Sequence, residues 1–335
     1  MRVLSLRRQR VGGIATYSAA LADALDPMGI EVVIDDADDW IPNETGFSTD
    51  RRVSKLVKKA AQGFDLVHAW GYRAAWACSE AFYVRQPWLY TAYDLPKTTN
   101  SQLIDRLNAA RVGICASRAV KLALDAADAI NLEHVGPGIG DPPTLLEKAA
   151  ARQRLALPTQ GAVVLGFGRM ERDRGFDALL DAMATVWTQV SDVHLVLLGD
   201  GTQHAELEKR ARSEGARVSV VSRVLDKWMW LRAADIVVVP SRRAGFSMVA
   251  AEAMRAGTPV LARRTGGLVE MGHEDVSIAF FHDDDDLGDK LSSLLREPVI
   301  LQTQGYSGQV RVEDQYSMSE AAQRHATLYR DLLAT

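Results

Sequence analysis

The chain has 335 residues, enough for two average domains, and its 47% hydrophobic and 24% charged residues are typical of a soluble globular protein. The formal net charge of −4 gives no electrostatic reason to expect nucleic acid as a partner. Cys78 and Cys115 lack the spacing of metal ligands, which indicates two reduced thiols and no disulfide framework.

Short apolar runs alternate with helical patterns from the start of the chain. The beginning, "MRVLSLRRQRVGG", has no long apolar segment, and no later stretch reaches the roughly 18 apolar residues that span a bilayer, so we expect a cytoplasmic protein. Helices are predicted at "IATYSAALADAL" and "AAWACSEAFYV", and strands at "RVLSL", "EVVID", "FDLVHAW", "PWLYTAYD", "VGICAS" and "INLEHVG". Strands that alternate with helices favour a parallel sheet covered on both faces.

The alternation is interrupted at "VGPGIGDPPT", where glycines and prolines predict a linker. It resumes with strands at "GAVVLGFG", "VHLVLLGDG", "RVSVV", "DIVVVPS", "PVLA" and "IAFF", and it ends with a helix in residues 317–335. We therefore predict an α/β protein with two Rossmann-like doubly wound domains, residues 1–138 and 139–316, facing a central cleft where strands end and helices begin.

Two segments of the second domain have the composition of a phosphate site. In "GFGRMERDRGFDALLDA", Arg169 and Arg174 follow a strand, and their forked donors suit a diphosphate, although two solvated arginines would look the same. In "SRRAGFSMVAAEAM", a helix that begins near Ser247 offers backbone N–H groups, and Gly245 lets a ligand approach. Glu252 stands among alanines of that helix, where it could accept hydrogen bonds from ribose hydroxyls, pair with an arginine, or face water.

Three other features have a functional and a purely structural interpretation. Gly12-Gly13 follows arginines at positions 7, 8 and 10 and permits a tight, positive loop beside a ligand, but glycine pairs are common in turns. "HDDDD", His282 to Asp286, could suggest a metal, but acids at a helix start are the better explanation. "RRVSKLVKKAAQ" is a basic amphipathic helix that fits an anionic membrane surface, although packing of its apolar stripe on the first domain is the better explanation.

Together these segments resemble the GT-B glycosyltransferases, and within them the retaining family GT4. "VGGIATYSAALADAL" is similar to the family's glycine-rich opening, "DLVHAW" to its "D-V-V-H" strand, and "ICASRAVKLAL" to its "V-S" segment. "GRMERDRG" resembles "G-R-L-x-x-x-K-G", and "LVLLGDG" resembles "I-x-G-x-G". The long segment "RAADIVVVPSRRAGFSMVAAEAMRAGTPVLARRTGG" resembles the family's "A-D-V-x-V-x-P-S" to "G-G" signature. The resemblance also implies that helix 317–335 returns to the first domain.

The resemblance implies a role for each segment. Arg169 and Arg174 would hold the donor diphosphate and stabilise the leaving group, without a metal or another cofactor, and Glu252 would bind the donor ribose. The family's sugar and acceptor pocket corresponds to Tyr93, Asp94, Ala244 and Trp70. The remaining donor-binding positions would be Gly12, Gly13, Gly245, Phe246, Ser247, Met248, Val249 and, beside the base with Ser222, Arg223.

Three positions depart from the family's pattern. Ala244 replaces the first acid of an E-x7-E pair, Tyr93 stands before Asp94 where a histidine is common, and Trp70 also stands where relatives often have histidine. The neighbouring Arg242 and Arg243 would make this rim positive and favour an acidic or deoxygenated sugar.

We expect a metal-independent, retaining glycosyltransferase that uses a nucleotide-diphosphate sugar. The acceptor would be a glycan, a lipid-linked compound or a small molecule, and the basic helix suggests peripheral contact with the inner membrane face. A catalytically altered nucleotide-sugar-binding protein is the main alternative, and an epimerase or phosphorylase of the same fold is the other.

Overall fold

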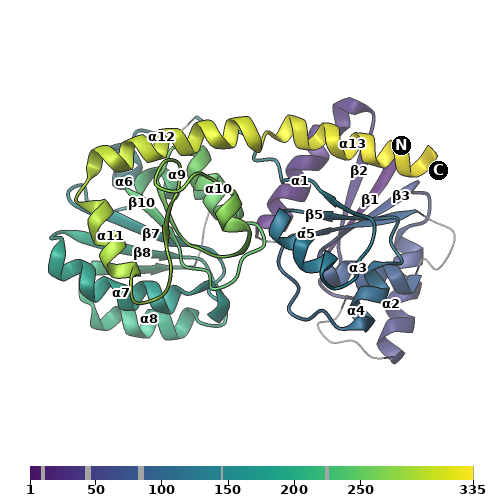
Figure 1. Cartoon of the computed structure of the whole chain (residues 1–335), viewed down its shortest axis with the longest axis horizontal. Helices are drawn as coiled ribbons and strands as arrows, with labels where there is room; N and C mark the ends of the chain where they lie inside the picture. Colours follow the sequence, from purple (N-terminus) through teal and green to yellow (C-terminus); the bar gives the residue numbers. More distant parts are fainter. Residues whose placement is uncertain (9–11, 42–46, 82–86, 145, 223–225, 335) are drawn as a thin grey trace. The chain divides into compact units, whose positions relative to one another are not determined.

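The computed structural model describes residues 1–8, 12–41, 47–81, 87–144, 146–222 and 226–334, with only the backbone of 47–50. The chain divides into two compact units (Figure 1). Unit 1 contains Met1–Gly140 together with Tyr316–Thr335, and unit 2 contains Asp141–Gln315. The last helix of the chain thus belongs to the same unit as the first strand.

Unit 1 is a parallel sheet of six strands flanked by helices (Figure 1). The sheet order is β2-β1-β3-β4-β5-β6. Its strands are β1 (Arg2–Arg7), β2 (Glu31–Asp36), β3 (Leu66–Trp70), β4 (Trp88–Ala92), β5 (Val112–Cys115) and β6 (Leu132–His134). Its helices are α1 (Gly13–Leu25), α2 (Phe47–Ala60), α3 (Gly71–Ala81), α4 (Ser101–Leu107), α5 (Arg118–Asp125) and α13 (Met318–Ala334).

Unit 2 repeats this architecture with the sheet order β12-β11-β10-β7-β8-β9. Its strands are β7 (Ala162–Phe167), β8 (Val193–Leu198), β9 (Val218–Val221), β10 (Ile236–Val239), β11 (Val260–Arg263) and β12 (Ala279–Phe281). Its helices are α6 (Lys148–Arg154), α7 (Phe176–Gln189), α8 (His204–Ser213), α9 (Lys227–Ala233), α10 (Met248–Arg255), α11 (Leu287–Leu295) and α12 (Pro298–Gln315). The predicted fold class, two Rossmann-like α/β domains, is confirmed.

Each sheet reverses its direction of winding once. In unit 1 the reversal lies between β1 and β3, and in unit 2 it lies between β7 and β10. Loops that leave the carboxyl ends of two such neighbouring strands run to opposite faces of the sheet, and the space between them is where doubly wound proteins bind ligands. The topology therefore selects the β7–α7 and β10–α10 loops as the place to look for a site in unit 2.

Helix α12 is an 18-residue element that the sequence pattern did not reveal. It contains Gly305 and Gly308, which normally weaken a helix. A Cβ atom at Gly305 would lie 2.3 Å from the carbonyl oxygen of Gly257, just beyond the end of α10. Close packing between two helices therefore requires the small residue that obscures the helical pattern.

Helix α13 is fixed to unit 1 by buried polar groups. His68 on β3 is fully buried and is hydrogen-bonded through Nδ1 to the Tyr329 hydroxyl (2.6 Å) and through Nε2 to the Thr91 hydroxyl (2.7 Å). Burial, with a smaller effect from His325, holds the pKa of His68 well below its ordinary value, so the ring is neutral. The terminal helix is thus joined to the centre of the first sheet.

Among the described residues, no helix is both long and apolar enough to cross a bilayer. On α2 the side chains of Val53 and Val57 are buried in the core of unit 1, while Lys55 and Lys58 are exposed. The apolar stripe thus packs on the domain, as one of the two interpretations required. Membrane contact through the basic face stays a prediction.

Replacing Tyr329 by Phe should lower the free energy of unfolding by about 1–3 kcal/mol, because Nδ1 of His68 loses its hydroxyl partner inside the core. Tyr306 on α12 is 70% exposed, and Tyr306→Phe is the matched control, expected to change stability by less than about 0.5 kcal/mol. The shift of the urea midpoint measures both effects. Equal stability of the two variants would show that the His68–Tyr329 bond contributes nothing.

Candidate functional site

The candidate site lies at the carboxyl edge of the unit 2 sheet, where β7 and β10 are neighbours. The loop after β7 carries both arginines of the predicted diphosphate clamp. Arg169 is exposed and Arg174 is partly buried at the end of a short 3-10 turn, Arg172–Arg174. Between them, Met170 is fully buried, and its backbone N–H donates to the carbonyl of Asp200 (2.8 Å). The buried Met170 therefore anchors a loop whose arginines lie nearer the surface.

The two loops of the site touch through a glycine. Gly175 has a φ of +71°, which favours glycine, and it directly precedes α7. A Cβ atom at this position would lie 2.2 Å from the carbonyl oxygen of Pro240 in the β10–α10 loop. In addition, the backbone N–H of Arg242 donates to the carbonyl of Asp173 (2.9 Å). The two loops are consequently joined by direct backbone contacts.

Helix α10 begins where the loop that follows β10 ends. The Ser247 hydroxyl accepts a hydrogen bond from the Ala250 N–H (3.2 Å) and caps the helix. Gly245, Phe246 and Met248 are buried around the cap, and Val249 is partly buried. The N–H groups and partial positive charge of a helix amino end suit a phosphate group.

Glu252 lies on the second turn of α10 with only 5% of its surface exposed. Its Oε1 contacts the Lys227 ammonium on α9 at 2.6 Å. Burial raises the pKa of Glu252, and the nearby charge and hydrogen bond of Lys227 partly oppose that shift. The partner is a lysine and not the arginine considered from the sequence, and the carboxylate does not simply face water.

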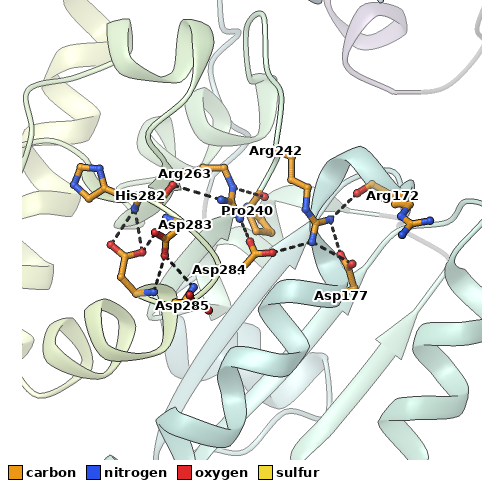
Figure 2. A network of polar contacts seen from close by, with 10 residues as sticks. Arg172, Asp177, Pro240, Arg242, Arg263, His282, Asp283, Asp284 and Asp285 are labelled. Carbon is orange, nitrogen blue, oxygen red and sulfur yellow. Dashed lines mark hydrogen bonds and ion pairs between the residues drawn. The ribbon is translucent and has the colours of Figure 1, made fainter.

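Ala244 is almost fully buried, and its carbonyl accepts a hydrogen bond from the Gly267 N–H (3.1 Å). The residue that replaces the family's first acid is therefore enclosed by the turn that follows β11. The expected positive rim beside it needs a correction. Arg242 is paired with Asp177 at 2.9 Å and with Asp284 at 3.1 Å, so its charge is neutralised within the protein (Figure 2). Of the two arginines expected to favour an acidic or deoxygenated sugar, Arg242 already has its counter-charges within unit 2.

The "HDDDD" segment forms a loop at the start of α11. The carboxylate of Asp286 accepts hydrogen bonds from the His282 and Asp283 N–H groups. The carboxylate of Asp283 accepts from the N–H groups of Asp285 (Figure 2) and Asp286. Within the part of the chain that the structure describes, no group of three or more His, Cys, Asp or Glu side chains is arranged to hold a metal ion. The segment therefore has a structural use as a helix start.

The sugar-side candidates of unit 1 lie together at the carboxyl ends of β3 and β4. Trp70 is buried, donates from Nε1 to the Ser5 hydroxyl (2.8 Å) and stacks on His68 with ring centroids 4.1 Å apart. Tyr93 is 6% exposed, and its ring centroid is 6.3 Å from that of Trp70. The next residue, Asp94, accepts a hydrogen bond at its backbone carbonyl from a neighbouring tyrosine hydroxyl. The assignment of these residues to the sugar and acceptor pocket stays a prediction.

Gly12 has a φ of +101° and precedes α1, which begins at Gly13. Arg7 does not add charge to this loop, because its guanidinium is buried and donates to the Ala15 carbonyl at 2.7 Å and to Asp36. Arg223 and Arg10 lie outside the described residues, and Ser222 is exposed.

Two residues that the structure places at or near the candidate positions, Lys227 and His68, were not among those expected from the sequence. Lys227 gave no usable signal, whereas His68 stood inside the quoted "DLVHAW" strand.

The architecture is shared with proteins of known structure. The fold is that of sucrose-phosphate synthase from Thermosynechococcus elongatus, with a TM-score of 0.85, 23% identity and full coverage of both chains. It is also that of HepE from Anabaena solved with UDP-glucose, with a TM-score of 0.83, 22% identity and coverage of 99% of this chain and all of the other. The chain has the GT-B fold of these proteins.

The sequence of unit 2 matches a family of glycosyltransferases. Residues 161–297 match the family described as "Glycosyl transferases group 1". A D-inositol 3-phosphate glycosyltransferase from Xylanimonas cellulosilytica is 30% identical over 275 residues, which are 70% of this chain and 64% of the relative. A second from Segniliparus rotundus is 35% identical over 161 residues, 43% of this chain and 34% of that one. The chain thus spans less than two thirds of the length of these relatives. The resemblance to GT-B glycosyltransferases is confirmed, and unit 2 carries the group 1 domain.

Replacing Gly175 by Ala should destabilise the chain by more than about 2 kcal/mol, because a side chain meets both a left-handed backbone and the Pro240 carbonyl. Gly215 has a similar φ of +64° with nothing within 4 Å of a Cβ atom, so Gly215→Ala is the matched control and should cost about 1 kcal/mol. Urea midpoints of the two variants separate the backbone effect from the collision. Equal losses of stability in the two variants would show that the contact between Gly175 and the Pro240 carbonyl adds nothing to the backbone effect.

Proposed function

We propose that this chain transfers a sugar from a nucleotide-diphosphate donor to an acceptor with retention of configuration. The observation that carries the proposal is the contact between the two loops that follow β7 and β10, the neighbouring strands between which the sheet reverses its winding. There the loop with Arg169 and Arg174 is hydrogen-bonded to the loop that leads into α10. Two guanidinium groups and a helix amino end are suited to hold one diphosphate. The group 1 family match over residues 161–297 covers both loops and supports this assignment.

The leaving group explains why this arrangement favours transfer over binding alone. In a retaining transfer the sugar passes through an oxocarbenium-like transition state while negative charge grows on the departing diphosphate. Fixed cations and helix N–H groups stabilise that charge without reorganisation. Glu252 then binds the donor ribose, and Tyr93, Asp94, Ala244 and Trp70 shape the sugar and acceptor side. No metal is needed for these steps, because the protein supplies the positive charge.

The comparisons supply the first substrates to test. HepE, which shares the fold, was solved with UDP-glucose, and the curated relatives are named for transfer to D-inositol 3-phosphate. We therefore propose a nucleotide hexose as donor and a phosphorylated polyol as acceptor. Product formation is followed by mass spectrometry across UDP-, GDP-, ADP- and TDP-sugars. Binding of a nucleotide without turnover of any donor would favour the alternative of a catalytically altered binding protein. The replacement of the family's first acid by Ala244 agrees with that alternative.

Replacing Arg169 or Arg174 by Ala should weaken binding of the donor nucleotide about ten- to hundredfold, since a hydrogen bond to a charged group contributes about 1.5–3 kcal/mol. Arg172 is an exposed arginine of the same loop without an assigned role, and Arg172→Ala is the matched control. Isothermal titration with UDP and GDP measures the effect. If all three variants bind like the parent, the diphosphate lies elsewhere.

Turnover should persist in excess EDTA. The fixed positive charge of Arg169, Arg174 and the α10 amino end replaces the divalent cation that other glycosyl transfers require. The initial rate is compared in EDTA and in added magnesium or manganese, with the same enzyme preparation. Complete loss of turnover in EDTA that magnesium or manganese restores would refute metal independence.

A further inference from the structure

Arg242 lies at the centre of an ion-pair network that joins four segments of unit 2. Its Nη1 donates to Asp177 (2.9 Å) and to the Arg172 carbonyl (2.8 Å), and its Nη2 donates to Asp177 (3.2 Å) and Asp284 (3.1 Å). Asp284 also contacts the guanidinium of Arg263, which in turn donates to the Pro240 carbonyl (3.3 Å). Figure 2 shows Arg242 and Arg263 converging on the carboxylate of Asp284, while Arg242 also reaches the carboxylate of Asp177.

The segments that Arg242 joins are those of the candidate diphosphate site. Its backbone N–H bonds to Asp173 and its side chain bonds to the Arg172 carbonyl, and both residues lie in the loop that carries Arg169 and Arg174. On its other side, Arg242 stands five residues before Ser247, the cap of α10. Arg242 therefore joins the two loops of the candidate site by both its backbone and its side chain.

The geometry of the Arg242–Asp177 contact suits a positioning role. The guanidinium bonds both carboxylate oxygens of Asp177, and such paired bonds fix the relative orientation of the two groups as well as their distance. Asp177 lies in the first turn of α7, where a negative charge is also favoured by the helix dipole. Burial would raise the pKa of Asp177, but hydrogen bonds and the charge of Arg242 outweigh it and lower that pKa. The carboxylate is therefore ionised near neutral pH.

The network is poorly suited to a role in overall stability. The side chains of Arg242 and Asp284 are 34% and 46% exposed, and exposed ion pairs contribute little to the free energy of unfolding. The two loops are already in contact through Gly175 and the Pro240 carbonyl. An orienting role for Arg242 is thus separable from folding.

From this arrangement we infer that Arg242 is a positioning residue for the donor diphosphate. It holds the loop of Arg169 and Arg174 in register with the amino end of α10, so that both act on the same two phosphates. The inference rests on the proposed function, because it assigns the diphosphate to these loops. Arg242 itself does not contact the donor, since its guanidinium is engaged by Asp177 and Asp284.

The test separates phosphate binding from nucleoside binding. Arg242→Met keeps the approximate length of the side chain and removes its bonds to Asp177, Asp284 and the Arg172 carbonyl. It should weaken binding of UDP or GDP about five- to thirtyfold, while the affinity for uridine or guanosine is unchanged. Arg210→Met is the matched control, because Arg210 forms an ion pair with Asp181, also on α7, and lies on α8 and not in either loop; this variant should bind like the parent. Asp177→Asn should reduce diphosphate affinity in the parent and have little further effect beside Arg242→Met.

A second measurement tests the positioning directly and needs no ligand. Amide hydrogen exchange at residues 171–175 and 244–247 should be faster in Arg242→Met than in the parent, with the strands of unit 2 unchanged. Unaltered diphosphate affinity, or equal losses for diphosphate and nucleoside, would overturn the positioning role alone. A parent chain that binds none of the nucleoside diphosphates would overturn the proposed function and the inference together.

Discussion

Parallel strands cannot be joined by tight turns, and this constraint determines where the chain can build a site. Each strand of unit 2 must be followed by a crossover, and the winding reverses between β7 and β10. Two crossovers therefore leave adjacent strand ends in opposite directions. Their first residues would diverge if nothing joined them. Gly175 lets the backbone of one loop reach the Pro240 carbonyl of the other, and Arg242 adds hydrogen bonds across the same contact.

The sequence predicted the strands well because buried parallel strands are continuous apolar runs. "VHLVLL" and "IVVV" are both almost entirely buried, and their pattern does not depend on distant residues. Helix α12 was missed for the opposite reason, since Gly305 is required by the close approach of the Gly257 backbone, which is remote in sequence. Local patterns thus predict elements whose burial is uniform and fail where one close contact determines the residue.

The candidate site divides in the same way. The positions of Arg169, Arg174 and Ser247 relative to their strands and helices follow from local sequence. Their electrostatic partners do not, because Asp177 and Asp284 are 65 and 42 residues from Arg242, and Lys227 is 25 residues from Glu252. The expectation of a positive rim at Arg242 was wrong because charge counted along the sequence ignores these neighbours. A motif can indicate that a phosphate is bound, but the fold decides which cations are available to bind it.

The pairing of Glu252 with Lys227 has a consequence for the charge of the site. An unpaired carboxylate on the second turn of α10 would oppose the positive amino end of that helix and repel a dianionic diphosphate. The Lys227 ammonium at 2.6 Å cancels most of that field at a distance and still leaves a carboxylate that can accept hydrogen bonds. Asp177 and Asp284 are likewise neutralised by arginines. These three acids can therefore lie close to the loops of the candidate site without reversing the sign of the potential there, because each of the three has its counter-charge within unit 2.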